Sequence, residues 1–172
     1  MPLLMAILVL AADQLTKQVI TNQLGPDEAS HRYDVVGTFL ALQYGENTGV
    51  AFGLLRGQTV LVTILALIVI GFLVRMYRHA RSASPVLAIG CGLILGGAAG
   101  NLVDRARLGY VVDFVAVSAW PKFNVADSAI TVGAFMLAWT YLRHNDDQRP
   151  ARRDDVTSAG PSMAIFSRES ER

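Results

Sequence analysis

The sequence predicts an α-helical integral membrane protein with four transmembrane helices and a small β-platform on its outer face. The first observation behind this prediction is the composition. Of the 172 residues, 52% are hydrophobic and only 17% are charged, whereas a soluble domain has about 25% charged residues. The mean hydropathy is +0.39, so a bilayer is the expected solvent. The second observation is a set of long apolar segments, and the third is a glycine-punctuated segment rich in β-formers.

Four segments are long and apolar enough to cross a bilayer core, which takes about 20 residues. The expected spans cover about residues 3–21, 57–75, 84–103 and 124–142. The third span carries five glycines that would let neighbouring helices approach closely. The first span is interrupted by Asp13 and Lys17. An apolar start that ends in Leu10-Ala11-Ala12 would also suit a cleaved signal peptide, but no basic region precedes it.

Basic residues predict the orientation, because they concentrate in cytoplasmic loops. Arg75, Arg78 and Arg81 follow the second span, and further arginines follow the fourth. Both termini are therefore expected in the cytoplasm. Residues 1–144 form one membrane domain, and residues 145–172, charged and without apolar periodicity, form a cytoplasmic disordered tail. The outer segment 33–55 mixes β-formers with glycines, which predicts the β-platform.

Six ionisable residues lie inside the spans or near their expected outer ends, where such groups are costly and mark functional sites by default. Asp13 and Lys17 are one helical turn apart and share one side of the first helix. Asp104 and Arg105 close the third helix. The remaining two, Asp113 in the loop after that helix and Asp127 at the start of the fourth, complete the set.

Two neighbouring carboxylates can share one proton, because both do not ionise easily at short separation. The ionised member then activates water while the other protonates a carbonyl oxygen, which hydrolyses a peptide without a metal or a nucleophilic side chain. Spacing alone leaves other interpretations open. Asp113 and Asp127 could equally cap helices or pair with Arg105 and Lys17, and Asp127 suits a helix N-cap. The single cysteine, Cys91, and three scattered histidines offer no metal cluster.

Five motifs along the chain resemble those of the lipoprotein signal peptidase (signal peptidase II) family. They occur in the family's order and span about residues 10–143. The motifs are Asp13-Gln14-x-Thr16-Lys17, Glu46-Asn47-Thr48-Gly49-Val50-Ala51-Phe52, Gly96-Gly97-Ala98-Ala99-Gly100-Asn101-Leu102-Val103-Asp104-Arg105, Val111-Val112-Asp113-Phe114 and Phe123-Asn124-Val125-Ala126-Asp127-Ser128. Any one of them is weak alone, and the five together are specific.

The resemblance implies a four-span aspartic endopeptidase of the bacterial inner membrane, with its active site near the outer face. Such an enzyme removes the signal peptide from a diacylglyceryl-modified prolipoprotein, cutting before the lipid-modified cysteine. The matching catalytic residues are Asp113 and Asp127, with no metal and no cofactor. The expected partners are this substrate and membrane lipid, and the expected state is a monomer. Substrate-binding or supporting roles fall on Asn47, Gly49, Asn101, Arg105 and Asn124, and structural roles on Asp13, Lys17 and Asp104.

Physical roles can be assigned to several of these residues. Asn47, Asn124 and Arg105 could hold substrate carbonyls, because a peptide in an apolar cavity needs partners for its backbone. Asn101 could orient an aspartate. The remaining expectations are an ion pair of Lys17 with Asp13 that fixes the first helix against the loop, an ion pair of Asp104 with Arg105, and an acyl-chain groove or ordinary core formed by Phe39, Phe52 and Phe114.

Two other classes of function fit the same aspartates. A small proton-coupled transporter would use them as a relay, but it is expected to show repeated halves, and no such repeat is visible. A metal-dependent membrane enzyme would use Asp104, Asp113 and Asp127 to hold Mg²⁺ against a phosphate. The net charge of +1 gives no support to nucleic-acid binding.

Overall fold

The computed structural model describes residues 1–26, 31–49, 55, 57–79 and 84–147. Within this part of the chain, four helices are long and apolar enough to cross a membrane, which confirms the predicted fold class. They are α1 (Pro2–Leu24), α2 (Thr59–His79), α3 (Pro85–Leu108) and α4 (Val125–Asp147). Each runs a few residues beyond its expected span. Of the predicted tail, only the first residues are described, and they continue α4.

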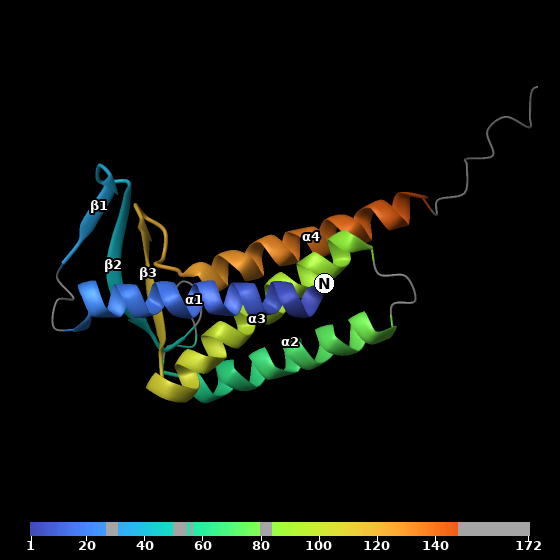
Figure 1. Cartoon of the computed structure of the whole chain (residues 1–172), viewed down its shortest axis with the longest axis horizontal. Coiled ribbons are helices and arrows are strands. Elements are labelled where there is room, and N and C mark those ends of the chain that lie inside the picture. The colour runs from blue at the N-terminus through green and yellow to red at the C-terminus, as the bar shows by residue number, and fades with distance from the viewer. Residues whose placement is uncertain (27–30, 50–54, 56, 80–83, 148–172) are drawn as a thin grey trace, which may run out of the picture.

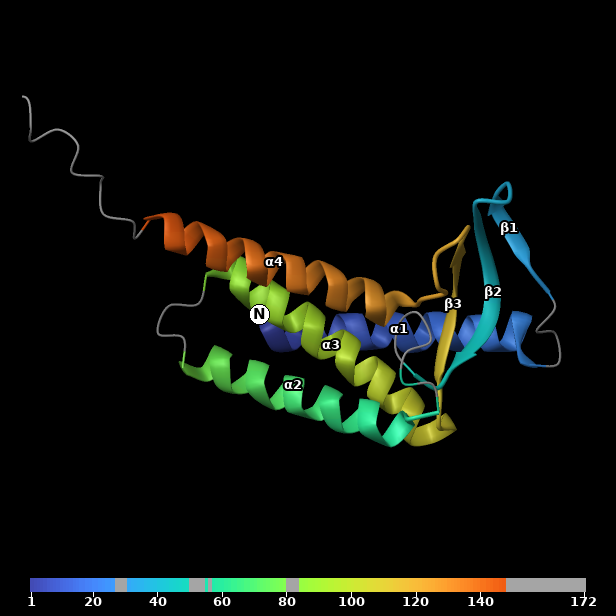
Figure 2. The same cartoon turned by 180° about the vertical axis from the view of Figure 1, so that it is seen from behind.

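Helix α3 is the centre of the bundle and packs against each of the other three helices (Figures 1 and 2). Its glycines make this possible. A methyl group at Gly96 would lie 2.6 Å from the Ala6 carbonyl oxygen of α1, and one at Gly90 would lie 3.2 Å from the Gly133 carbonyl oxygen of α4. Small residues at such crossings let membrane helices pack backbone against backbone.

The predicted β-platform is a three-stranded antiparallel sheet in the order β1-β2-β3. It consists of β1 (Tyr33–Val36), β2 (Leu40–Asn47) and β3 (Val111–Val117). Figure 1 shows it at one end of the helix bundle. The third strand corrects the prediction that Asp113 lies in a loop. It pairs with β2, which is more than sixty residues away in the sequence, and periodicity within residues 111–117 does not reveal such a distant partner.

Strand β3 is buried on both faces, and the two faces have different roles. Val112 and Phe114 point into the small core of the sheet, where they pack with Ile20 of α1 and Tyr44 of β2. Residues two apart in a strand share a face, so Asp113 projects from the opposite face. The core on one side of β3 therefore fixes the direction of a carboxylate on the other.

The junction of α3 and β3 is tied to the start of α2. Gly109 ends α3 in the left-handed conformation, with φ of 82°, and its N–H donates to the Arg105 carbonyl. A left-handed residue at this position is favourable for glycine because it has no Cβ. The Gly109 carbonyl then accepts a hydrogen bond from the Thr59 hydroxyl at 3.0 Å. The sheet, α2 and α3 therefore meet at the same end of the bundle.

Candidate active site

Asp113 is buried, with 3% of its surface exposed, and each of its carboxylate oxygens accepts a hydrogen bond from an amide. Asn47 of β2 donates to Oδ2 at 2.9 Å, and Asn124 donates to Oδ1 at 2.8 Å. The sheet register explains the first contact, because Asn47 is paired with Val111, two residues from Asp113, and diagonal neighbours in a sheet lie within side-chain reach.

Asp127 lies at the start of α4, but it does not cap the helix as the N-cap interpretation supposed. Asn124, the residue before the helix, takes that position. Its Oδ1 accepts from the Asp127 N–H at 2.9 Å, and Asp127 Oδ2 accepts from the Asn124 N–H at 3.3 Å. This reciprocal arrangement is a capping box. It holds the Asp127 carboxylate against the positive end of the helix dipole, which favours a negative charge there.

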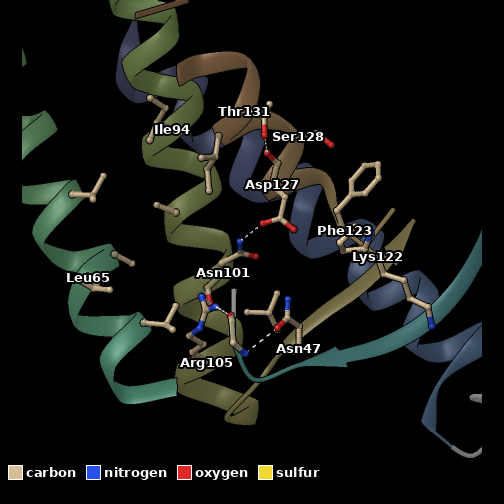
Figure 3. A pocket seen from close by; sticks show the side chains of 18 of the residues that line it. Asn47, Leu65, Ile94, Asn101, Arg105, Lys122, Phe123, Asp127, Ser128 and Thr131 are labelled. Carbon is tan, nitrogen blue, oxygen red and sulfur yellow. Dashed lines mark hydrogen bonds between the residues drawn. The ribbon is translucent and has the colours of Figure 1, made fainter. Parts of the chain in front are cut away.

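Asn101 and Asn124 bridge the two carboxylates. Asn101 of α3 donates from Nδ2 to Asp127 Oδ1 at 2.8 Å, and its own Oδ1 accepts from Asn124 Nδ2 at 3.2 Å. Figure 3 shows Asn101 aimed at Asp127 from the neighbouring helix. Because Asn124 also donates to Asp113, an unbroken chain of hydrogen bonds runs between the two aspartates.

Behind this bridge lies a buried ionic cluster centred on Lys17. The Lys17 amine is 2.8 Å from Asp13 Oδ2 and 2.8 Å from Asp104 Oδ2, and it donates to Asn101 Oδ1 at 3.0 Å. Asp13 also accepts from the Ala126 N–H at 2.9 Å. The expected pair of Lys17 with Asp13 is therefore present, but it fixes α1 against α3 and α4 instead of against a loop.

The expected ion pair of Asp104 with Arg105 is wrong. Consecutive residues on a helix point in different directions, so Asp104 faces α1 and meets Lys17, while Arg105 lines the cavity between α2, α3 and α4. Asp104 also accepts from the Val112 N–H at 3.1 Å, which joins α3 to β3. Arg105 instead donates to the Gly49 carbonyl at 3.0 Å, and Gly49 in turn donates its N–H to Asn47 at 2.9 Å.

A cavity of about 660 Å³ opens beside these groups, bounded by α2, α3 and α4. Its deep part is apolar and is lined by side chains such as Leu65 and Ile94. Its end near the sheet is polar, and Asn47, Asn101, Arg105 and Asp127 all line it (Figure 3). Asn124, by contrast, is completely buried and holds side chains of the site in place. The cavity is therefore an apolar compartment with the Asp127 carboxylate at its polar end.

The electrostatic environment near the sheet gives Asp113 a different pKa from that of an exposed aspartate. Burial, and next the negative charge of Asp127, raise the pKa of Asp113 to about 7, although the hydrogen bond from Asn47 acts in the other direction. Asp113 is therefore a carboxyl group that can hold a proton near neutral pH.

A cation also lies at this end of the cavity. Lys122 lines the cavity and donates to the Tyr44 carbonyl at 3.2 Å. Burial lowers the pKa of this amine.

Of the aromatic residues predicted to form an acyl-chain groove or ordinary core, the two that the structure describes do not line the cavity. Phe114 is in the sheet core and Phe39 is exposed at the edge of the sheet, while Phe52 lies outside the described residues. The cavity instead has Trp120 and Phe123 in its lining, together with Lys122. Sequence reasoning gave these three no role in a cavity, because residues 118–123 match neither a helix nor a strand period. The available signal was their place in the chain, since Phe123 opens the fifth motif and Trp120 and Lys122 lie just before it.

Four apolar helices with two neighbouring carboxylates at one end of the bundle define a polytopic membrane protein. The model of the family described as Signal peptidase (SPase) II matches residues 5–143. The chain therefore belongs to the signal peptidase II family, a family of proteases, as the motifs indicated.

Similar proteins cover nearly the same region. A lipoprotein signal peptidase from Moorella thermoacetica is 46% identical over 143 residues, which are 81% of this chain and 91% of the relative. Another, from Pelotomaculum thermopropionicum, is 43% identical and covers 85% of this chain and 93% of the relative. A solved structure of a bacterial membrane enzyme superposes with a TM-score of 0.79 at 27% identity, over 88% of this chain and 93% of the other.

Proposed function

We propose that this protein is an aspartic endopeptidase that removes the signal peptide from diacylglyceryl-modified prolipoproteins, cutting before the lipid-modified cysteine. The observation that carries the proposal is the pair of Asp113 and Asp127, which hydrogen bonds bridge, with Asp127 at the polar end of an apolar cavity. The names of the relatives supply the substrate class, since both are lipoprotein signal peptidases.

The environments of the two carboxylates suit different tasks. Asp113 is nearly inaccessible and its raised pKa favours the protonated form. Asp127 lines the cavity, and its two hydrogen bonds and its place at a helix N-terminus favour the ionised form against the cost of burial. Different surroundings of two titratable groups are the usual basis for assigning acid and base. In this mechanism, Asp127 is the base and Asp113 is the acid.

Hydrolysis then proceeds in two balanced steps. Asp127 takes a proton from water as the water oxygen attacks the peptide carbonyl carbon, while Asp113 donates its proton to the carbonyl oxygen. In the second step, the C–N bond breaks, Asp127 returns its proton to the leaving nitrogen of the cysteine, and Asp113 recovers a proton from a hydroxyl of the intermediate. Both groups finish in their starting states, and no metal or cofactor takes part.

The cavity provides partners for both parts of the substrate. A signal peptide in the membrane is apolar, and the deep cavity wall of α2 and α3 presents apolar side chains to it. At the polar end, the backbone carbonyls of the substrate need donors. Arg105 is suited to this role, because its Nε is buried and has no hydrogen-bond partner among the described residues. Lipid would contact the exposed apolar outer faces of the helices.

The same geometry supports an orientation. Arg75 and Arg78 of α2 and Arg143 of α4 lie at the end of the bundle away from the sheet. By the positive-inside rule, that end is cytoplasmic in a bacterial inner membrane. We therefore place both termini inside and the sheet with the aspartates near the outer face. A monomer is sufficient, because one chain supplies both aspartates and the cavity wall.

The competing metal hypothesis needs Asp104 beside the two other aspartates, but Asp104 is directed to Lys17. The test is cleavage of a diacylglyceryl-modified prolipoprotein by the purified protein in detergent with EDTA. We expect the wild type to cut before the modified cysteine, and Asp113→Asn and Asp127→Asn each to lose at least about 1000-fold in kcat, within the range that catalytic groups contribute. Asp34→Asn is the matched control, because Asp34 is an exposed aspartate of β1. Near-normal cleavage by either active-site variant would refute the mechanism.

A further inference from the structure

Lys17 is the buried charge whose contribution to the site is least obvious. It does not line the cavity, only 4% of its surface is exposed, and its amine is engaged by protein acceptors, so it has no donor left for the substrate. An ammonium group has three hydrogens and no acceptor. The Lys17 amine has three acceptors within reach, which belong to Asp13, Asp104 and Asn101. Two of them are carboxylates, which more than balance its charge, whereas the third is the neutral side chain that contacts Asp127.

The contact with Asn101 determines which way that amide points. The oxygen and nitrogen of an asparagine side chain are nearly equal in shape, and only the hydrogen-bond partners select one orientation. Lys17 can be paired only with the oxygen, because it is solely a donor. With Oδ1 held by Lys17 at 3.0 Å and by Asn124 at 3.2 Å, the Asn101 NH₂ is directed to Asp127 Oδ1 at 2.8 Å.

We propose that Lys17 is a positioning residue that fixes the orientation of the Asn101 amide and thereby keeps Asp127 as the ionised member of the pair. This inference rests on the proposed aspartic mechanism. If the Asn101 amide were reversed, its oxygen would face Asp127 and favour the protonated form. Lys17 therefore affects the catalytic base across two helices, without contacting it or the substrate.

Direct attraction between Lys17 and Asp127 does not account for the same effect. Asp13 and Asp104 both contact the Lys17 amine at 2.8 Å, so the three charges together are negative and their combined field does not favour a further negative charge. The other charged groups near Asp127 are Asp113 of β3 and Arg105 of α3, with Lys122 across the cavity lining. None of them contacts the side-chain oxygen of Asn101, so they are not expected to select the orientation of the amide.

The test uses a substitution that preserves the charge of the cluster. The double variant Lys17→Met/Asp13→Asn removes one positive and one negative charge, and an asparagine at 13 can still accept the Ala126 N–H that Asp13 accepts now. Asp13→Asn alone is the matched control that retains Lys17. The measurement is the pH profile of kcat/KM for prolipoprotein cleavage. We expect the acidic limb of the double variant to move up by about one pH unit, which is about a tenfold loss of activity below the limb. The limb of the control, which loses only a negative charge, should not move up.

A second substitution shows whether the effect passes through Asn101. Asn101→Leu leaves both ion pairs of Lys17 in place and removes the donor to Asp127, so it should move the acidic limb in the same direction. Combining it with the double variant should add no further shift, because non-additivity marks residues that act through one another. If the combined variant shifts the limb by the sum of the two effects, Lys17 does not act through Asn101 and the proposal is wrong.

A purely structural role gives a different result. It would lower kcat by the same factor at every pH and leave the acidic limb unmoved, which overturns the proposal. Should the double variant not purify as a folded protein, Asn101→Leu still decides, because an unmoved limb in that variant contradicts the inference. These outcomes can be distinguished from a failure of the proposed function. Retained cleavage activity in Asp113→Asn would show that the proposed function itself is wrong.

Discussion

A single methyl group on the glycine face of α3 should reduce catalysis without touching a catalytic side chain. Gly97 packs against the first turn of α4. A Cβ added at Gly97 would lie 2.9 Å from Ile130 Cγ1 and closer still to the Ala126 carbonyl oxygen. The flexible Ile130 side chain can yield, but the Ala126 backbone is held by its hydrogen bond to Asp13. Gly97→Ala therefore has to move α4, which carries Asp127.

The size of the effect follows from two opposing terms. Overpacking a closely packed interior costs about 1–3 kcal/mol, and replacing glycine by alanine within a helix recovers about 1 kcal/mol. A net loss of up to about 2 kcal/mol in the free energy of unfolding is expected. The catalytic loss should be larger, because a misplacement of about 1 Å can cost about 100-fold in rate. We expect kcat to fall by about 10- to 100-fold while the protein remains folded.

Gly71→Ala is the matched control. Gly71 lies within α2, and a Cβ added there meets nothing within 4 Å, so the substitution should leave kcat unchanged and raise stability by up to about 1 kcal/mol. The assay pairs kcat for prolipoprotein cleavage with unfolding in mixed detergent micelles. If Gly97→Ala matches Gly71→Ala in both measurements, the close packing of α3 on α4 does not position the base.

Three further predictions follow from other parts of the structure. Because burial and then Asp127 raise the pKa of Asp113 to about 7, the Asp113 proton is lost as the pH rises through 7, so kcat/KM should fall there. The folded state binds this proton more tightly than the unfolded state, so stability should also decline from about pH 4 to 7, and a flat activity profile up to pH 9 would contradict the assignment. Arg105→Met removes the donor to the Gly49 carbonyl and a charge that lines the cavity. It should raise KM about tenfold or more, and a change in kcat alone would argue against substrate contact. Ser84→Ala removes the cap that accepts from the Leu87 N–H at 3.1 Å. It should cost about 1 kcal/mol in stability with activity retained, and reduced activity in a fully folded sample would show that the effect is not confined to the cap.

The sequence predicts the helices well because each is a local property of the chain. An apolar run of about 20 residues needs no knowledge of its neighbours, and all four runs are helices. The sheet was only partly predictable. The β-formers of Tyr33–Asn47 were visible, but β3 depends on a partner more than sixty residues away. The place of Phe123 in the cavity lining was not predicted for a similar reason, because it depends on the tertiary structure.

The partners of the charged residues were the hardest part to predict. Adjacent opposite charges at Asp104 and Arg105 suggest a pair, yet neighbours on a helix diverge, and each finds a partner on another element. Asn124 shows the same limitation. Its sequence context identifies a helix start, but only the structure reveals that it caps α4 and also donates to Asp113. The order of the motifs identifies the residues of the candidate site, whereas the hydrogen-bond partners of each residue depend on the tertiary fold.

The glycines of α3 connect the packing of the bundle with the polar network. Gly97 faces the turn that carries Asp127, and a Cβ added at Gly100 would lie 3.1 Å from the Asp13 side-chain carbon Cγ. Asp13, Lys17 and Asp104 are nearly inaccessible, and in a membrane such groups are tolerated only when they satisfy one another. They can do so only if the helices approach closely. The absence of side chains at 97 and 100 is therefore a precondition for the hydrogen bonds that hold Asn101 and Asp127 in place.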